Sequence, residues 1–368
     1  MNETRSQKKV PIYAWQEWND NTSSQSLEKQ FNEWRSHGIE GICFNAHFDV
    51  EKTSIAAKAA KKAGLIYHAW VPCMLQPDRD KSWYAVNRLG QPAWQVQAYV
   101  KHYTCMDPHN PEVQNFLVDK CKAIAAITEV DFIQLDYIRY ADVILPIGLW
   151  PKYGLVMNEE YPTADYCYCD SCTSDFKRHT GIDIKAIKDP SKCKEWAQFR
   201  YDVITSLVNK ISDAIHTMGK KISADVFPGP DSYAKKMVRQ EWDKWHIDAF
   251  FPMHYNDFYL KPPEWTGEMT HEGVQSLNGR VPLYSGLCIC PYLDKSQAPD
   301  LVLSGLTPTE LEIAITSSLD NGATGICLFT ADRLTPQHWQ VLSGTIKKWT
   351  DKHQHQSAHI QPNEPIHF

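Results

Sequence analysis

The chain has 368 residues, of which 43% are hydrophobic and 22% are charged, a composition that supports a full core and excludes disordered and collagen-like proteins. Lysine and arginine number 38 against 44 aspartate and glutamate residues, and the resulting net charge of -6 argues against nucleic acid as a partner. No apolar run reaches the ~18 residues that a membrane-spanning helix needs, so we expect no transmembrane segment.

Short apolar runs alternate with amphipathic segments along the chain. Eight runs have the length and composition of buried strands: 11–15, 41–45, 66–72, 131–136, 221–227, 247–253, 281–287 and 324–330. Helices are predicted over 27–37, 50–63, 111–127, 194–218, 233–244, 308–320 and 336–350. Asn110 before Pro111 and Thr307 before Pro308 are typical helix starts. Eight alternating units predict a parallel sheet, and its expected closure is a (β/α)8 TIM barrel.

The spacing of these strands predicts where the barrel carries extra chain. The intervals after the third and fourth strands are much longer than most of the others, which predicts long insertions there. We expect residues 1–10 to form a flexible stub, 11–350 a single barrel domain with a Cys-rich insertion at about 141–193, and 351–368 a flexible tail. A doubly wound open sheet is the alternative, but residues 16–20 after the first strand lack the glycines of a phosphate-binding turn.

Two acidic residues follow neighbouring strands of this barrel. The active site of a TIM barrel forms at the carboxyl ends of the strands, where Asp136 follows the fourth apolar run and Asp225 the fifth. Adjacent strands lie ~4.8 Å apart, so both carboxyl groups can face one cavity at the separation that glycoside cleavage uses. We expect Asp136 to be the nucleophile or base and Asp225 the acid, with exchanged roles or purely structural roles as alternatives. Glu17 is a third candidate acid.

Other polar and aromatic residues near the strand ends are candidate substrate contacts: Asn45, His47, Tyr137, Arg139, His254, Tyr255 and Trp18. Arg139 is expected to pair with Asp136 and keep it charged. The histidines could equally be structural hydrogen-bond partners. Trp15 and Trp70 lie inside predicted strands, so we expect them to belong to the core.

Three segments carry a family resemblance. DFIQLDYIRY (131–140), ISADVF (222–227) and IDAFFPMHY (247–255) resemble, in this order, glycoside hydrolases of the family-10-like and DUF4015 type. The resemblance implies a TIM barrel that acts on a polysaccharide or oligosaccharide, with Asp136 and Asp225 at the family's acidic positions. The long insertion after strand 4, and Ala141 and Asp142 where the family often has a proline, depart from the pattern and leave the substrate open. The resemblance also implies a periplasmic or cell-surface protein whose leader has been removed, whereas many free thiols are typical of a cytoplasmic one.

The predicted insertion contains a C-x-C-x-x-C motif formed by Cys167, Cys169 and Cys172. Three closely spaced thiols can bind zinc together with one further ligand, for which Cys105 and Cys193 are candidates. The motif resembles a segment of family-42 β-galactosidases in which a similar trio binds zinc structurally, which implies a brace and not a catalytic metal. Free or partly disulfide-bonded thiols are the alternative.

The sequence therefore predicts a glycoside hydrolase that needs no cofactor for catalysis. A carbohydrate-binding protein that kept the barrel and lost the chemistry is the second hypothesis, because a fold does not imply an activity. A metal-dependent hydrolase of the amidohydrolase kind ranks last. That class is expected to carry a His-x-His pair on the first strand, and the only such pair here is His353 and His355 in the predicted tail.

Overall fold

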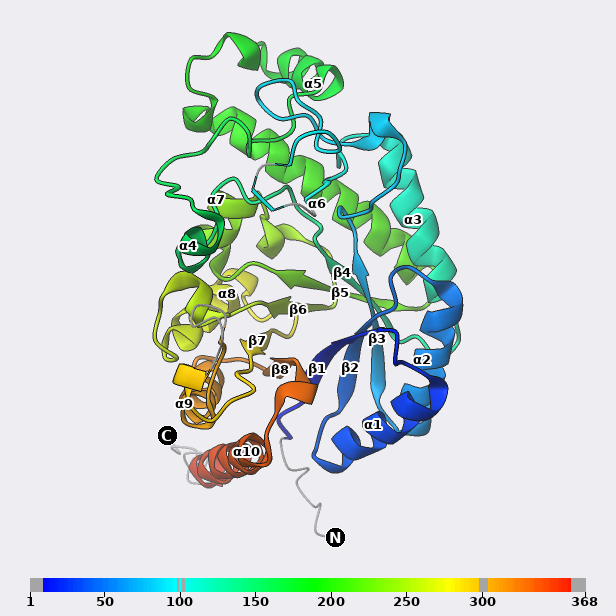
Figure 1. The fold of residues 1–368 in the computed structure, drawn as a ribbon, viewed down its shortest axis with the longest axis vertical. Coiled ribbons are helices and arrows are strands. Elements are labelled where there is room, and N and C mark those ends of the chain that lie inside the picture. Colours follow the sequence, from blue (N-terminus) through cyan, green and yellow to red (C-terminus); the bar gives the residue numbers. More distant parts are fainter. Residues whose placement is uncertain (1–8, 98, 101–102, 298–303, 359–368) are drawn as a thin grey trace, which may run out of the picture.

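A computed structural model describes residues 9–97, 99–100, 103–297 and 304–358 of the chain. The predicted stub therefore lies outside the described residues up to residue 8, and the predicted tail from residue 359 onward. The eight strands are β1 (Ile12–Glu17), β2 (Gly41–Asn45), β3 (Ile66–Pro72), β4 (Phe132–Asp136), β5 (Lys221–Val226), β6 (Ala249–Pro252), β7 (Tyr284–Cys288) and β8 (Gly325–Phe329). They pair in parallel in the order β6-β5-β4-β3-β2-β1-β8-β7, with helices around the sheet (Figure 1). The predicted (β/α)8 barrel is confirmed.

The barrel closes between β6 and β7 through single bridges and not through a continuous ladder. The bridges join Phe250 to Leu283 and Met253 to Gly286. A Cβ atom on Gly286 would lie 2.7 Å from the Trp15 ring and 2.8 Å from a backbone oxygen of β6. Only glycine leaves room there, because the indole of Trp15 fills the barrel interior beside this seam.

Six helices lie close to their predicted positions: α1 (Ser24–Ser36), α2 (Val50–Lys62), α3 (Pro111–Ala125), α6 (Lys194–His216), α9 (Pro308–Asp320) and α10 (Pro336–Ala358). The last continues beyond its predicted end at residue 350. The Asn110 side chain accepts a hydrogen bond from the backbone of Glu112 at 2.9 Å, and Thr307 forms a capping box with Glu310, as the helix-start motifs predict. Helix α8 (Trp265–Leu277) was not predicted.

The predicted helix over 233–244 is wrong. The chain instead forms a π-helical turn (Gly229–Ala234), the short helix α7 (Lys235–Val238) and a 3-10 turn (Trp242–Lys244). Arg239 ends α7 because it adopts a left-handed conformation with φ of +60°, which no α-helix can continue through.

The core has an outer and an inner part. The outer part fills the space between sheet and helices with large side chains such as Phe31, Phe44 and Phe250. The inner part lies inside the barrel and contains Tyr13, Trp15, Cys43, Ala249, Phe251 and Cys327. No helix within the described ranges is long and apolar enough to cross a membrane.

Long insertions follow β3 and β4, as predicted, and they lie together at the top of the barrel in Figure 1. The second contains α4 (Trp150–Tyr153) and α5 (Asp170–Thr180). The insertions contact each other through a bridge between Asn87 and Tyr166. A buried ion pair between Asp165 and Arg200 ties the second insertion to α6. All eleven cysteines are free thiols, and nine of them are buried.

Candidate active site

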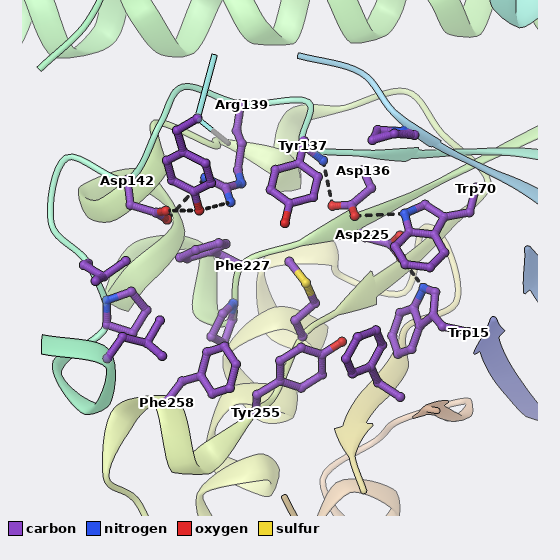
Figure 2. A pocket seen from close by; sticks show the side chains of 18 of the residues that line it. Trp15, Trp70, Asp136, Tyr137, Arg139, Asp142, Asp225, Phe227, Tyr255 and Phe258 are labelled. Carbon is purple, nitrogen blue, oxygen red and sulfur yellow. Dashed lines mark hydrogen bonds and ion pairs between the residues drawn. The ribbon is translucent and has the colours of Figure 1, made fainter. Parts of the chain in front are cut away.

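Asp136 and Asp225 lie side by side at the carboxyl ends of β4 and β5. The register of the two strands pairs Leu135 with Ala224, so the aspartates are the next pair along it. Partners in a parallel register point to the same face, which places both carboxyl groups in the barrel mouth (Figure 2). Both line one cavity of about 390 Å³. Its aromatic lining consists of Trp15, Trp70, Tyr103, Tyr137, Phe227, Tyr255, Phe258, Tyr259 and Phe329.

Hydrogen-bond donors reach both oxygens of Asp136. Trp70 Nε1 donates to Oδ2 at 2.8 Å, and the backbone N–H of Tyr137 donates to Oδ1 at 2.6 Å. Tyr137 adopts a left-handed φ of +48°, a strained conformation for a non-glycine residue that is typical of functional sites. Burial raises the pKa of Asp136, while the two N–H donors and the charge of Arg139 oppose that rise.

Asp225 is held differently. Its Oδ1 accepts hydrogen bonds from Trp15 Nε1 at 3.2 Å and from Gln134 Nε2 at 2.7 Å. Its Oδ2 is buried and has no hydrogen-bond partner among the described residues. Burial, and after it the negative charge of Asp136, raises the pKa of Asp225 well above the usual range of a carboxyl group.

The two tryptophans expected in the core, Trp15 and Trp70, also line the cavity. Trp15 packs inside the barrel and Trp70 against that cluster, but each indole N–H donates to one of the two carboxyl groups. Gln134 was missed as well. The signal that could have found it is its position two residues before Asp136, which places a polar side chain on the same inward face of an apolar strand.

Arg139 does not form the expected ion pair with Asp136. Its guanidinium donates to Asp142 Oδ1 at 3.2 Å and to the Tyr103 hydroxyl at 3.3 Å, and it lies 4.9 Å from the ring centres of Tyr137 and Phe227. Asp142 lies three residues further along the chain, and Tyr103 comes from the insertion after β3. We call Tyr103, Arg139 and Asp142 the arginine wall of the cavity.

Three further predicted residues line the cavity. Glu17 is exposed, whereas Asn45 and Tyr255 are buried to 7% and 8% exposure. The Tyr255 ring stacks on Phe329 with 5.5 Å between the ring centres. This arrangement presents aromatic faces and one exposed carboxylate to a ligand that enters the barrel mouth.

Three other predicted contacts, His47, His254 and Trp18, are not among the residues that line the cavity. His254 is fully buried, and its Nδ1 lies 2.9 Å from Ser285 Oγ between sheet and helix. It lies outside the cavity lining, and burial lowers the pKa of His254 to about 3, so it is a neutral residue that forms hydrogen bonds within the core. His47 turns its Nε2 toward the backbone oxygen of Trp18 at 3.2 Å, outside the cavity lining.

A second cluster lies within the insertions. Asp107, Cys167, Cys169 and Cys172 each offer one ligand atom, and these four atoms lie within 4.8 Å of one another. Such a group could hold a metal ion such as zinc. The predicted fourth ligands, Cys105 and Cys193, are not part of the cluster within the described ranges, and Asp107 takes that place.

Comparisons with known proteins bear on the fold. No model of a known protein family matches the chain, and no curated protein matches its sequence. The glycoside hydrolase domain of PgaB (BpsB) from Bordetella bronchiseptica has a similar structure, with a TM-score of 0.64 and 11% identity over 93% of this chain and 98% of that domain. The catalytic domain of β-amylase from Paenibacillus polymyxa gives 0.60 and 12% over 94% and 99%.

The spore cortex-lytic enzyme SleL from Bacillus megaterium is a third similar structure, with a TM-score of 0.50 and 10% identity over 93% of this chain and 75% of that one. At these identities the likeness shows the fold alone. The chain is thus a TIM barrel of the kind found in several glycoside hydrolases, and its resemblance to the family-10-like type stays a prediction.

Proposed function

We propose that the protein is a glycoside hydrolase in which Asp136 and Asp225 cleave a glycosidic bond of a polysaccharide or oligosaccharide. The observation that carries this proposal is the pair of adjacent carboxyl groups on the floor of an aromatic-lined cavity at the barrel mouth. Glycoside cleavage needs two carboxyl groups in different protonation states, and their surroundings here differ in that respect.

The two environments assign the roles. Asp225 acts as the acid, because its pKa is raised well above the usual range and its Oδ1 is occupied by two N–H donors, which leaves Oδ2 to carry the proton. That proton passes to the glycosidic oxygen as its bond to the anomeric carbon breaks. Asp136, with an N–H donor on each oxygen, acts as the carboxylate that attacks the anomeric carbon or takes a proton from the attacking water.

The remaining cavity residues bind and orient the sugar. The faces of Tyr137, Phe227 and Tyr255 suit stacking on the apolar faces of sugar rings. Glu17 at the rim accepts hydrogen bonds from sugar hydroxyl groups. The Arg139 guanidinium already donates hydrogen bonds to Asp142 and Tyr103. It therefore forms a fixed part of the cavity surface and does not move to bind a substrate.

This reaction uses two carboxyl groups and needs no metal ion. We propose that the cluster in the insertions holds zinc in a structural role, because thiolates favour zinc and a full set of four protein ligands leaves no open position for substrate.

The test is hydrolysis of a panel of 4-nitrophenyl glycosides and soluble polysaccharides, followed by released nitrophenol and by new reducing ends. We expect Asp136→Asn to lower the turnover of any cleaved substrate by ~10²–10⁴-fold. Asp332→Asn is the matched control, since Asp332 also follows a strand, β8, but is exposed and does not line the cavity.

Equal turnover in wild type and Asp136→Asn would refute the catalytic proposal. Absence of cleavage across the panel, together with equal sugar binding by both proteins in calorimetry, would favour the carbohydrate-binding protein instead. A loss of turnover in Asp332→Asn as large as in Asp136→Asn would also contradict the assignment.

A further inference from the structure

We propose that Asp107 is the fourth ligand of a zinc ion held by Cys167, Cys169 and Cys172, and that this ion fastens the two insertions together behind the arginine wall. Cys169 Sγ lies 3.1 Å from Asp107 Oδ2, and Cys172 Sγ lies 3.7 Å from both carboxyl oxygens. Ligand atoms around one tetrahedral zinc ion lie ~3.5–3.8 Å apart, given Zn–S and Zn–O bonds of ~2.3 and ~2.0 Å. The cluster therefore has the size of a single zinc site.

The surroundings of the cluster suit thiolate ligands. Cys167 and Cys172 are each 1% exposed and Asp107 is 4% exposed. Backbone N–H groups point at the sulfur atoms, from Val86 to Cys167 at 3.3 Å and from Cys172 to Cys169 at 3.4 Å. Such donors stabilise metal-bound thiolates, and each thiol releases its proton when the metal binds. A group of four protein ligands, of which three are buried and Cys169 is partly exposed, is typical of a structural site.

The burial of the Asp107 carboxyl is a second observation that favours a metal. Its Oδ1 accepts one backbone N–H, from His109 at 2.9 Å, and its other neighbours in the cluster are thiols, which are weak donors. A buried carboxyl group with so little hydrogen bonding is costly unless a cation compensates it. Zinc would supply that charge.

The four ligands come from different insertions. Asp107 belongs to the segment after β3 and the cysteines to the segment after β4. These segments also build the arginine wall, since Tyr103 shortly precedes Asp107 and donates its hydroxyl proton to Asp142. An ion that joins the insertions therefore positions the wall. This consequence rests on the proposed function, whereas the metal site itself does not.

The metal site is tested by elemental analysis of the full chain and by competition with a chelator. We expect one zinc ion per chain, at least ~10-fold weaker binding in Asp107→Ala and Cys172→Ser, and wild-type binding in the matched controls Asp183→Asn and Cys193→Ser. Replacement by cobalt is expected to give the visible absorption of a tetrahedral thiolate site. Circular dichroism of each variant checks that the barrel is folded.

A wild-type chain that takes up no zinc after refolding with zinc, or Asp107→Ala with wild-type affinity, would overturn the metal site. The ion is also expected to position the arginine wall. Removal of zinc should therefore change the near-ultraviolet circular dichroism of the protein, to which Tyr103 of the wall contributes, and lower kcat/KM of the folded protein. An unchanged aromatic spectrum or an unchanged kcat/KM would overturn that role. If no glycoside is cleaved, the proposed function fails, while zinc content and the aromatic spectrum still decide this inference.

Discussion

Replacing Asp225 by asparagine is expected to make the protein more stable and less active. The asparagine oxygen can keep both hydrogen bonds that Oδ1 of Asp225 accepts, from Trp15 and from Gln134. The amide NH2 group replaces Oδ2, which is buried without a partner among the described residues, and it carries no charge for Asp136 to repel. Relieving one unsatisfied buried group contributes ~1–3 kcal/mol to stability.

The pH dependence of this effect has a definite sign. The pKa of Asp225 is raised in the folded state, so the folded chain holds a proton that the unfolded chain releases above its ordinary pKa of ~3.9. Folding therefore becomes less favourable as the pH rises above that value, up to the folded pKa. Asparagine does not titrate. The gain in stability of Asp225→Asn is expected to be largest at neutral pH and smallest near pH 3.

Urea unfolding at pH 7 and at pH 4, together with turnover of a cleaved glycoside, measures both effects. Turnover is expected to fall by ~10²–10⁴-fold because the general acid is lost. A variant that is less stable than wild type at pH 7 would refute the reasoning, since Asp225 would then be a structural carboxylate. A more stable variant with full turnover would refute its catalytic role.

Three further substitutions test the surroundings of the site. Trp70→Phe removes an N–H donor from Asp136, so the pKa of that carboxyl group rises and the acidic limb of the pH–rate profile moves to higher pH; an unchanged acidic limb would contradict this. Arg200→Met leaves the Asp165 carboxyl buried without its main partner, and urea unfolding is expected to show a loss of ~3–5 kcal/mol; a loss below ~1 kcal/mol would contradict this. Gly286→Ala overfills the seam between β6 and β7, so a loss of ~1–3 kcal/mol and reduced turnover are expected, and wild-type values for both would be contrary.

The barrel could be predicted because buried parallel strands leave continuous apolar runs in the sequence. Helix α8 was not predicted, because Thr266, Gly267, Thr270 and Gly273 interrupt the apolar pattern that Trp265, Met269 and Leu277 make on its buried face. Gly267 and Gly273 lie on it, and a Cβ atom on Gly273 would come within 2.7 Å of Leu283. Small and polar residues at these positions weaken the hydrophobic period that the sequence displays.

The two aspartates of the site could be predicted because a carboxyl group at the end of an apolar strand has no ordinary structural reason to be there. Their hydrogen-bond partners depend on side-chain direction across the barrel, which places Trp70 on one carboxyl group and Trp15 on the other. Asp107 could not be predicted, because only the tertiary contact between two insertions brings it to the cysteines. The spacing of these residues along the sequence does not indicate such a contact.

The central claim is that Asp225 donates a proton while Asp136 acts as the carboxylate. The most direct measurement compares turnover on a glycoside with an activated leaving group, such as 2,4-dinitrophenol, and on the same glycoside with an ordinary sugar leaving group. An activated group leaves without protonation, so Asp225→Asn is expected to retain far more of its activity on that substrate, whereas Asp136→Asn loses both activities. Equal losses on the two substrates in Asp225→Asn, or full activity in Asp136→Asn, would contradict the account.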